Sequence, residues 1–156
     1  MRVGLLTPLL ALAFVSAACA GRSRPEPSAA PTVQYLTPFG APTRPFSPAV
    51  RVGNMLYLAG QIGTTADAGG GVIAGGIEPE TRQTMENIRA VLERSGSSMD
   101  RVVKCTVMMA DMREWDRMNV VYASYFPKNK PARSAFGANG LALGARVEIE
   151  CWATVG

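Results

Sequence analysis

The sequence predicts an α+β domain in which two helices cover one face of a mixed β-sheet. Several segments place apolar residues at every second position, as strands do, and two others place them at the helical spacing of three and four. The clearest strand closes the chain: one set of alternate residues is apolar, and the other set is charged or amphipathic. The apolar set is Val147, Ile149, Cys151, Ala153 and Val155, and the other is Arg146, Glu148, Glu150 and Trp152. At 156 residues, one domain is expected.

A hairpin is predicted near the start of this domain. Two β-rich runs, 49–52 and 55–61, flank Gly53 and Asn54, a pair typical of a two-residue turn. The Gly-rich segment 64–76 follows. It lacks the Lys-Ser/Thr of a phosphate-binding loop, so we interpret it as a flexible loop.

The first helix is predicted over 79–94. Met85, Ile88, Val91 and Leu92 fall on one helical face, which would pack on the sheet. Pro79 suits the first turn of this helix, and Gly96 suits its C-terminal cap. The β-branched segment 101–110 is predicted to be a strand.

The second helix is predicted to begin after Asp111, a plausible N-cap. Its repeating residues are interpreted as core: Trp115, Met118, Tyr122 and Tyr125. The face of the sheet away from the helices would carry Trp152 and Met108 together with charges. An open surface of that kind suggests a face that meets another subunit.

The N-terminus is predicted to lie outside the fold. Residues 1–20 have a positive Arg2, an apolar run over 5–15 and then small residues, the layout of a secretory signal peptide. One interpretation makes Cys19 the lipidated first residue of a mature lipoprotein, although Ser16 stands where Leu is usual. Others are ordinary cleavage before Gly21, or a start codon placed too far upstream. Residues 21–32, rich in Pro, Ser and Ala, read as a linker before a domain over 33–156.

These features predict an exported, periplasmic protein. Any attachment to the membrane would be through a lipid anchor at Cys19. Export would leave Cys105 and Cys151 in a compartment that permits a disulfide. Both fall in predicted strands, and we interpret them as buried small apolar side chains, with a bond between them as the alternative.

The composition argues against a nucleic-acid partner and against a metal site. The net charge is +4 and the Arg residues are scattered, whereas nucleic-acid binding needs a basic stripe or patch. The sequence has no His and no cluster of metal ligands.

Four segments occur in an order and spacing that resembles the Rid family, the reactive intermediate deaminases, also called the YjgF family. They are VRVGNMLYLAGQIG, TRQTMENIRAVLERSGSSMDRVVKCTVMMADM, MNVVYASYFP and PARSAFGANGLALGARVEIECWA. The resemblance implies a six-stranded mixed sheet with two helices on one face, in a homotrimer with clefts between subunits. The family was once labelled L-PSP endoribonuclease, but export, the missing His and the few Lys residues argue against RNA cleavage.

The resemblance implies hydrolysis of 2-imino acids to 2-keto acids and ammonia, with no metal or organic cofactor. By the same resemblance, Arg133 holds the substrate carboxylate and Glu150 positions or activates the attacking water, while Asn119 and Gly60 line the cleft. The planar fork of Arg suits a carboxylate because it donates two parallel hydrogen bonds. Left to the residues alone, Arg133 could instead pair with a carboxylate at an interface, Asn119 could be structural, and Glu148 and Glu150 could both be solvated.

Three positions depart from the family pattern, and each loses a polar group. Phe46 stands where a Tyr is common, Ala59 where a Ser is common, and Ala135 where a Cys is frequent. These substrate-binding positions therefore suggest weaker or altered binding. The alternative function is a non-catalytic, periplasmic trimer that binds small carboxylates or keto acids.

Overall fold

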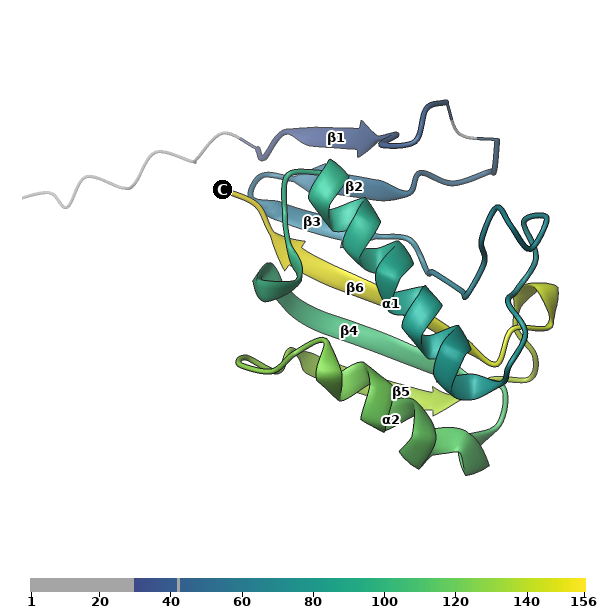
Figure 1. Cartoon of the computed structure of the whole chain (residues 1–156). Coiled ribbons are helices and arrows are strands. Elements are labelled where there is room, and N and C mark those ends of the chain that lie inside the picture. The colour runs from purple at the N-terminus through teal and green to yellow at the C-terminus, as the bar shows by residue number, and fades with distance from the viewer. Residues whose placement is uncertain (1–29, 42) are drawn as a thin grey trace, which may run out of the picture.

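The computed structural model describes residues 30–41 and 43–156 (Figure 1). A six-stranded sheet has the order β1-β2-β3-β6-β4-β5, in which β4 and β5 are parallel and every other neighbouring pair is antiparallel. The strands are β1 Val33–Leu36, β2 Ala49–Val52, β3 Met55–Leu58, β4 Val102–Met109, β5 Ala132–Gly137 and β6 Val147–Thr154. The helices are α1 Ile77–Arg94 and α2 Trp115–Ser124. The α+β class and the mixed sheet are confirmed.

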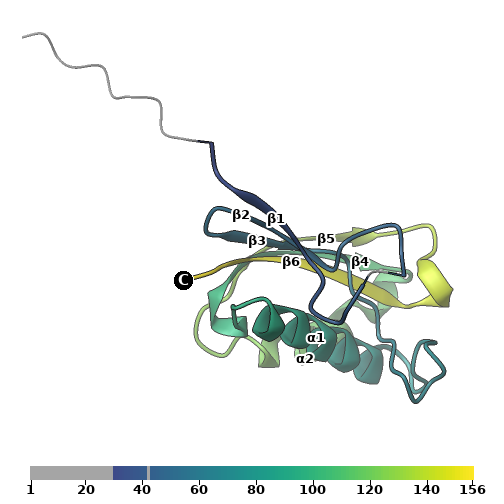
Figure 2. The ribbon, with the colours of Figure 1, turned by 90° about the horizontal axis from the view of Figure 1, so that it is seen from above.

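Both helices lie on the same face of the sheet, and the other face is open (Figure 2). The core between the layers takes its apolar side chains from α1, α2 and the inward positions of β3, β4 and β6. Its fully buried members include Leu56, Ile77, Met85, Ile88, Leu92, Val107, Met109, Met118, Val147 and Ile149. The alternation predicted for 147–155 is confirmed, since the apolar set is buried and Trp152 is 40% exposed.

Local signals placed the elements closely. The hairpin turns at Gly53, whose φ of 58° suits glycine, but β3 ends at Leu58 rather than at residue 61. Helix α1 begins two residues before the predicted Pro79 and ends at Arg94, with Gly96 at a φ of 81° just beyond. Asp111 does act as a cap, but of a 3-10 turn, Met112–Glu114, that leads into α2.

A buried carboxylate fixes α1 to the start of β6. Glu80 is 2% exposed, and its Oε1 accepts hydrogen bonds from the backbone N–H groups of Arg146 (2.6 Å) and Val147 (3.2 Å). Burial raises the pKa of Glu80, and this effect is larger than the lowering caused by the two hydrogen bonds. The contact anchors the N-terminal end of the strand that carries Glu148 and Glu150.

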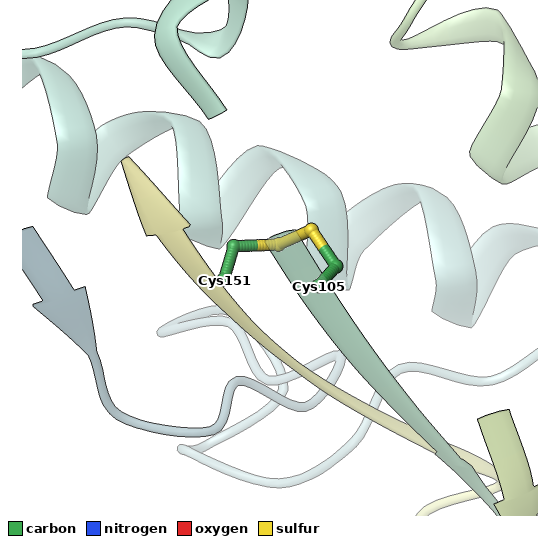
Figure 3. The surroundings of a disulfide bond; sticks show 2 residues. All are labelled: Cys105 and Cys151. Atoms are coloured by element: carbon green, nitrogen blue, oxygen red, sulfur yellow. A yellow bond between two sulfur atoms is a disulfide. The ribbon is translucent and has the colours of Figure 1, made fainter. Parts of the chain in front are cut away.

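The interpretation of Cys105 and Cys151 as separate apolar side chains is wrong in this structure, where they form a disulfide (Figure 3). Both residues are fully buried, as expected. The antiparallel register of β4 and β6 sets them directly opposite each other, with Cα atoms 4.1 Å apart. The alternation within each strand predicts that both cysteines are buried, but the disulfide can be predicted only from the way the two strands pair.

Predictions for the N-terminus lie largely outside the described residues. The signal peptide over 1–20, Cys19 and most of the linker over 21–32 belong to residues 1–29. Residues 30–32 lead directly into β1. Among the helices of the described residues, none has the length and apolar character needed to cross a membrane.

The disulfide should contribute strongly to stability. It closes a loop with a sequence separation of 46, and such cross-links stabilise by about 2–4 kcal/mol, mainly by restricting the unfolded chain. We expect urea unfolding in the presence of a reductant to show that loss. Because both cysteines are fully buried, reduction should require unfolding.

The control is a Cys105→Ala, Cys151→Ala double variant, whose urea midpoint should not respond to reductant. A wild-type midpoint equally indifferent to reductant would contradict a stabilising bond.

Candidate functional site

Arg133 is held between β5 and α2. It is in register with Cys105 on β4 and therefore shares the helix-covered face of the sheet. Its Nη1 donates a 2.7 Å hydrogen bond to Oδ1 of Asn119, and its guanidinium carbon lies 5.0 Å from the ring centroid of Trp115 and 4.8 Å from that of Tyr122. Asn119, predicted either as a cleft residue or as a structural one, thus contacts the predicted catalytic arginine directly.

No carboxylate of the described residues pairs with Arg133. The ion pairs of this part of the chain involve Arg89, Arg113, Arg117 and Arg146. A half-buried guanidinium with one neutral amide partner keeps most of its N–H groups for another acceptor. This arrangement suits an anion from outside the protomer, and the alternative of a carboxylate across a subunit interface stays open because that carboxylate would belong to a second copy.

Two glutamates stand on the open face of β6. Glu150 is opposite Thr106 and Glu148 is opposite Met108, and both side chains are half-buried. Burial raises the pKa of Glu148, and the negative charge of Glu150 raises it further. Glu148 is therefore a stronger base than an isolated glutamate side chain.

Gly60 makes room for Glu148. A methyl group at residue 60 would overlap Oε1 of Glu148 and would lie 2.9 Å from its Cδ. The backbone after β3 is held in place by two hydrogen bonds between Gln61 and Ile149, each 2.9 Å long. Gly60, predicted to line the cleft, thus lies against the carboxylate of Glu148.

A cavity of about 510 Å³ opens beside this segment. Phe46 and Gly60, two predicted substrate-binding residues, line it, as do Arg44, Gln61 and Asn87. The Nδ2 of Asn87 on α1 donates to the carbonyl oxygens of Ile62 (2.9 Å) and Thr64 (3.0 Å) and so fixes the wall of the cavity. Phe46 is 47% exposed, so the apolar ring in place of a Tyr lies at the rim.

The predicted site residues fall into two groups that one protomer does not join. Arg133, Asn119 and Ala135 lie at the β5 edge, with Arg133 and Ala135 on the helix-covered face. Phe46, Gly60, Glu148 and Glu150 lie around β6 and the end of β3. Ala59 belongs with them, since its N–H donates to the carbonyl of Pro48 (3.0 Å). From β3 to β5 is three strand spacings, roughly 14 Å.

Three residues of the site were not identified from the sequence as site residues. Trp115 and Tyr122 were interpreted as core, because their helical spacing cannot distinguish packing on the sheet from packing on Arg133. Glu148 was interpreted as solvated, because the close approach of Gly60 joins residues 88 positions apart. The sequence signal that could have found the two rings is their position at i−4 and i+3 from Asn119.

No group of three or more potential metal ligands occurs among residues 30–41 and 43–156. The expectation of no metal or organic cofactor stays a prediction. The chemistry available to the described side chains is anion binding by Arg133 and proton transfer or water binding by the glutamates.

The fold and these half-sites define a class: small proteins with one mixed sheet, two helices on one face and an arginine poised for an anion. Residues 38–155 match the model of a family described as Endoribonuclease L-PSP. The chain belongs to this family, the one that the four sequence segments resembled.

Among the curated relatives, a RutC family protein of Pyrococcus horikoshii is 43% identical over 109 residues, 70% of this chain and 86% of that protein. The protein of Homo sapiens named 2-iminobutanoate/2-iminopropanoate deaminase is 38% identical over 112 residues, 72% of this chain and 81% of that one. The Arabidopsis thaliana relative named Reactive Intermediate Deaminase A, chloroplastic, is 37% identical over 111 residues, 71% of this chain and 59% of that one.

Solved structures support the fold. Yeast Mmf1 superposes with a TM-score of 0.73 at 34% identity, covering 80% of this chain and all of that one. The E. coli YjgF gene product gives a TM-score of 0.68 at 30% identity, covering 73% of this chain and 91% of that one. E. coli TdcF, solved with bound serine, gives 0.68 at 26% identity, covering 74% and 91%.

The raised pKa of Glu148 predicts a pH-dependent cost to stability. Because its folded-state pKa lies above the ordinary 4.5, the folded protein holds this proton more tightly than the unfolded chain. The cost is absent well below pH 4.5, grows as the pH rises, and is complete above the folded-state pKa. We expect Glu148→Gln to unfold at a higher temperature than wild type at pH 7, with the difference shrinking on acidification.

Glu150→Gln is the control on the same face, since removing its charge should lower the pKa of Glu148 and relieve only part of the cost. If the stability gained by Glu148→Gln over wild type were smaller at pH 7 than at pH 4, the pKa of Glu148 would not be raised in the folded protein.

Proposed function

We propose that this protein hydrolyses 2-imino acids to 2-keto acids and ammonia, using no cofactor. The observation that carries the proposal is Arg133, a guanidinium held by Asn119 and two aromatic rings with no carboxylate partner in the described chain. Relatives at 37–38% identity are named 2-iminobutanoate/2-iminopropanoate deaminase or Reactive Intermediate Deaminase A. The serine bound by TdcF also carries a carboxylate beside a nitrogen-bearing carbon.

The reaction needs little beyond position and electrostatics. Arg133 binds the substrate carboxylate, which places the adjacent protonated imine carbon for attack. A glutamate holds a water and takes its proton as the water oxygen bonds to that carbon and the C=N electron pair moves to nitrogen. The protonated glutamate then gives its proton to the amine nitrogen of the carbinolamine. The carbon–nitrogen bond breaks as the glutamate takes the hydroxyl proton, so that ammonia leaves and the hydroxyl oxygen becomes the keto oxygen.

Glu148 is the stronger candidate for the glutamate that takes the proton. A general base works best when its pKa approaches the working pH, and burial together with Glu150 moves the pKa of Glu148 upward. Glu150, the residue assigned from the sequence, would then support the reaction by keeping that pKa high. Both remain in the proposal as the carboxylate pair of the open face.

The two half-sites imply that the active protein is an oligomer, which we propose to be a homotrimer. Arg133 and the glutamates occupy opposite faces of one sheet, so a complete site requires Arg133 of one protomer beside the glutamates of another. The open face carries exposed apolar side chains that a second copy would cover, among them Phe136 at 49% and Trp152 at 40%. Clefts between subunits follow from this arrangement.

We also propose that the protein works outside the cytoplasm. The signal-like residues 1–20, with Cys19 as a lipid-attachment site or a cleavage site nearby, and the buried Cys105–Cys151 bond are both typical of exported proteins. Cell fractionation of wild type and Cys19→Ala would test this, since a lipid anchor predicts membrane association that the variant loses.

The hydrolysis assay uses 2-iminopropanoate or 2-iminobutanoate generated in situ by an amino-acid oxidase, with keto-acid release measured against the spontaneous rate. Wild type should accelerate release. Arg133→Ala should raise KM by about 10- to 100-fold, the value of one charge-assisted hydrogen bond. Glu148→Gln should lower kcat by about 100-fold, and Glu150→Gln by less.

Wild type that is no faster than Arg133→Ala would reject the proposal. If keto acids still raised the melting temperature of wild type, the alternative of a carboxylate-binding trimer without catalysis would stand instead. The loss of polar groups at Phe46, Ala59 and Ala135 is consistent with that alternative.

Gly60→Ala tests the placement of Glu148 without touching its charge. The new methyl group must displace the end of a flexible side chain, so the fold should survive while the carboxylate turns away. We expect kcat to fall toward that of Glu148→Gln, with little change in melting temperature. Gly137→Ala is the matched control, because the tightest contact of its methyl group would be 3.1 Å, with Cγ of the flexible Met112 side chain. Equal kcat in both alanine variants and wild type would remove Glu148 from the site.

A further inference from the structure

Two aromatic rings of α2 enclose the guanidinium of Arg133. Its central carbon lies 5.0 Å from the ring centroid of Trp115 and 4.8 Å from that of Tyr122, within the range of cation–π attraction. We propose that Trp115 and Tyr122 are positioning residues that hold Arg133 in the orientation that binds the substrate carboxylate. This rests on the proposed function, and nothing in the family match or the relatives' names assigns the two rings a role.

The helix delivers these contacts from one stripe. Trp115, Asn119 and Tyr122 are spaced by four and three residues, so they share a face of α2. That face presents a ring, an amide and a second ring to a single guanidinium. Asn119 engages Nη1 at 2.7 Å, and the rings contact the guanidinium by cation–π attraction. A cation–π contact uses the charge of the guanidinium and none of its N–H groups, so those not bonded to Asn119 stay available to a carboxylate.

A second arginine near the same helix shows the contrast. Arg89 lies 5.1 Å from the ring centroid of Tyr125, but it also forms a 2.8 Å ion pair with Glu86. Arg89 is therefore neutralised within the chain, and its contact is structural. Arg133 has two rings and an amide where Arg89 has a carboxylate. The rings can restrain a long flexible side chain without using up its charge.

The ring of Tyr122, rather than its hydroxyl, is the part that acts in this proposal. The residue is 7% exposed, and its hydroxyl has no hydrogen-bond partner among the described residues. Burial raises the pKa of Tyr122 to about 12, so the hydroxyl is neutral under working conditions. Tyr122→Phe keeps the ring and removes only this unpaired group, which makes it a direct discriminator.

The experiment measures KM and kcat for imine hydrolysis, and the dissociation constant for 2-oxobutanoate by calorimetry, on the full assembled protein. Trp115→Leu and Tyr122→Leu should each raise KM and the dissociation constant by about 3- to 30-fold, the range of a cation–π contact, with kcat within about threefold. Tyr122→Phe should bind like wild type. Tyr125→Leu is the matched control on the same helix and should leave KM unchanged.

A double-variant cycle separates positioning from simple structural support and remains informative if a leucine variant does not fold. Trp115→Phe, which has a weaker π face, should raise KM about threefold in wild type but have no effect in an Arg133→Gln background, because a neutral side chain has no cation–π attraction to lose. The same change in both backgrounds would show a purely structural role and overturn the proposal.

The remaining outcomes are also decisive. Leucine variants that fold and bind 2-oxobutanoate like wild type would overturn the positioning role of Trp115 and Tyr122. The same conclusion would follow if Tyr122→Phe weakened binding as much as Tyr122→Leu does. If wild type binds 2-oxobutanoate but hydrolyses no imine, the proposed function fails. The dissociation constants of the variants for 2-oxobutanoate then still decide whether the two rings position Arg133. If wild type binds no keto acid, both fail together.

Discussion

The antiparallel register of β4 and β6 is the constraint on which the rest of the molecule depends. It sets Cys105 opposite Cys151 inside the core and Thr106 opposite Glu150 on the open face. The parallel pairing of β5 with β4 has its own register, which places Arg133 beside Cys105, under α2. A shift of β6 by one residue would turn Cys151 to the open face, away from Cys105, and would bury both glutamates, so the disulfide and the position of the glutamates depend on one register.

One sheet thus separates the two kinds of charge that the proposed reaction needs. A guanidinium within reach of a carboxylate would be neutralised by it and would lower that carboxylate's pKa. With the strands between them, Arg133 stays available to a ligand, and Glu148 keeps a raised pKa beside Glu150. In the proposed oligomer these groups would meet only between protomers, where a substrate carboxylate could occupy the arginine.

Much of the fold could be predicted from local patterns, because alternation and helical spacing report burial directly. The two-faced strand 147–155, the Gly53 turn and both helices followed from such patterns, and Arg133, Asn119 and Gly60 followed from the family resemblance. The disulfide, the contact of Gly60 with Glu148 and the rings around Arg133 depend on strand pairing and on helix placement over β5. Those are relations between distant segments, and a single sequence gives only the residue types at each end.

The disulfide has a topological consequence beyond stability. Cys105 and Cys151 enclose α2 and β5 in one covalent ring, so Arg133, Asn119, Trp115 and Tyr122 all belong to a closed loop of the chain. That ring ties α2 and β5 at both ends to the core of their own protomer, which opposes their exchange with the same elements of another copy. In the proposed oligomer, an arginine that reaches a neighbour's glutamates would then come from a protomer that is already folded.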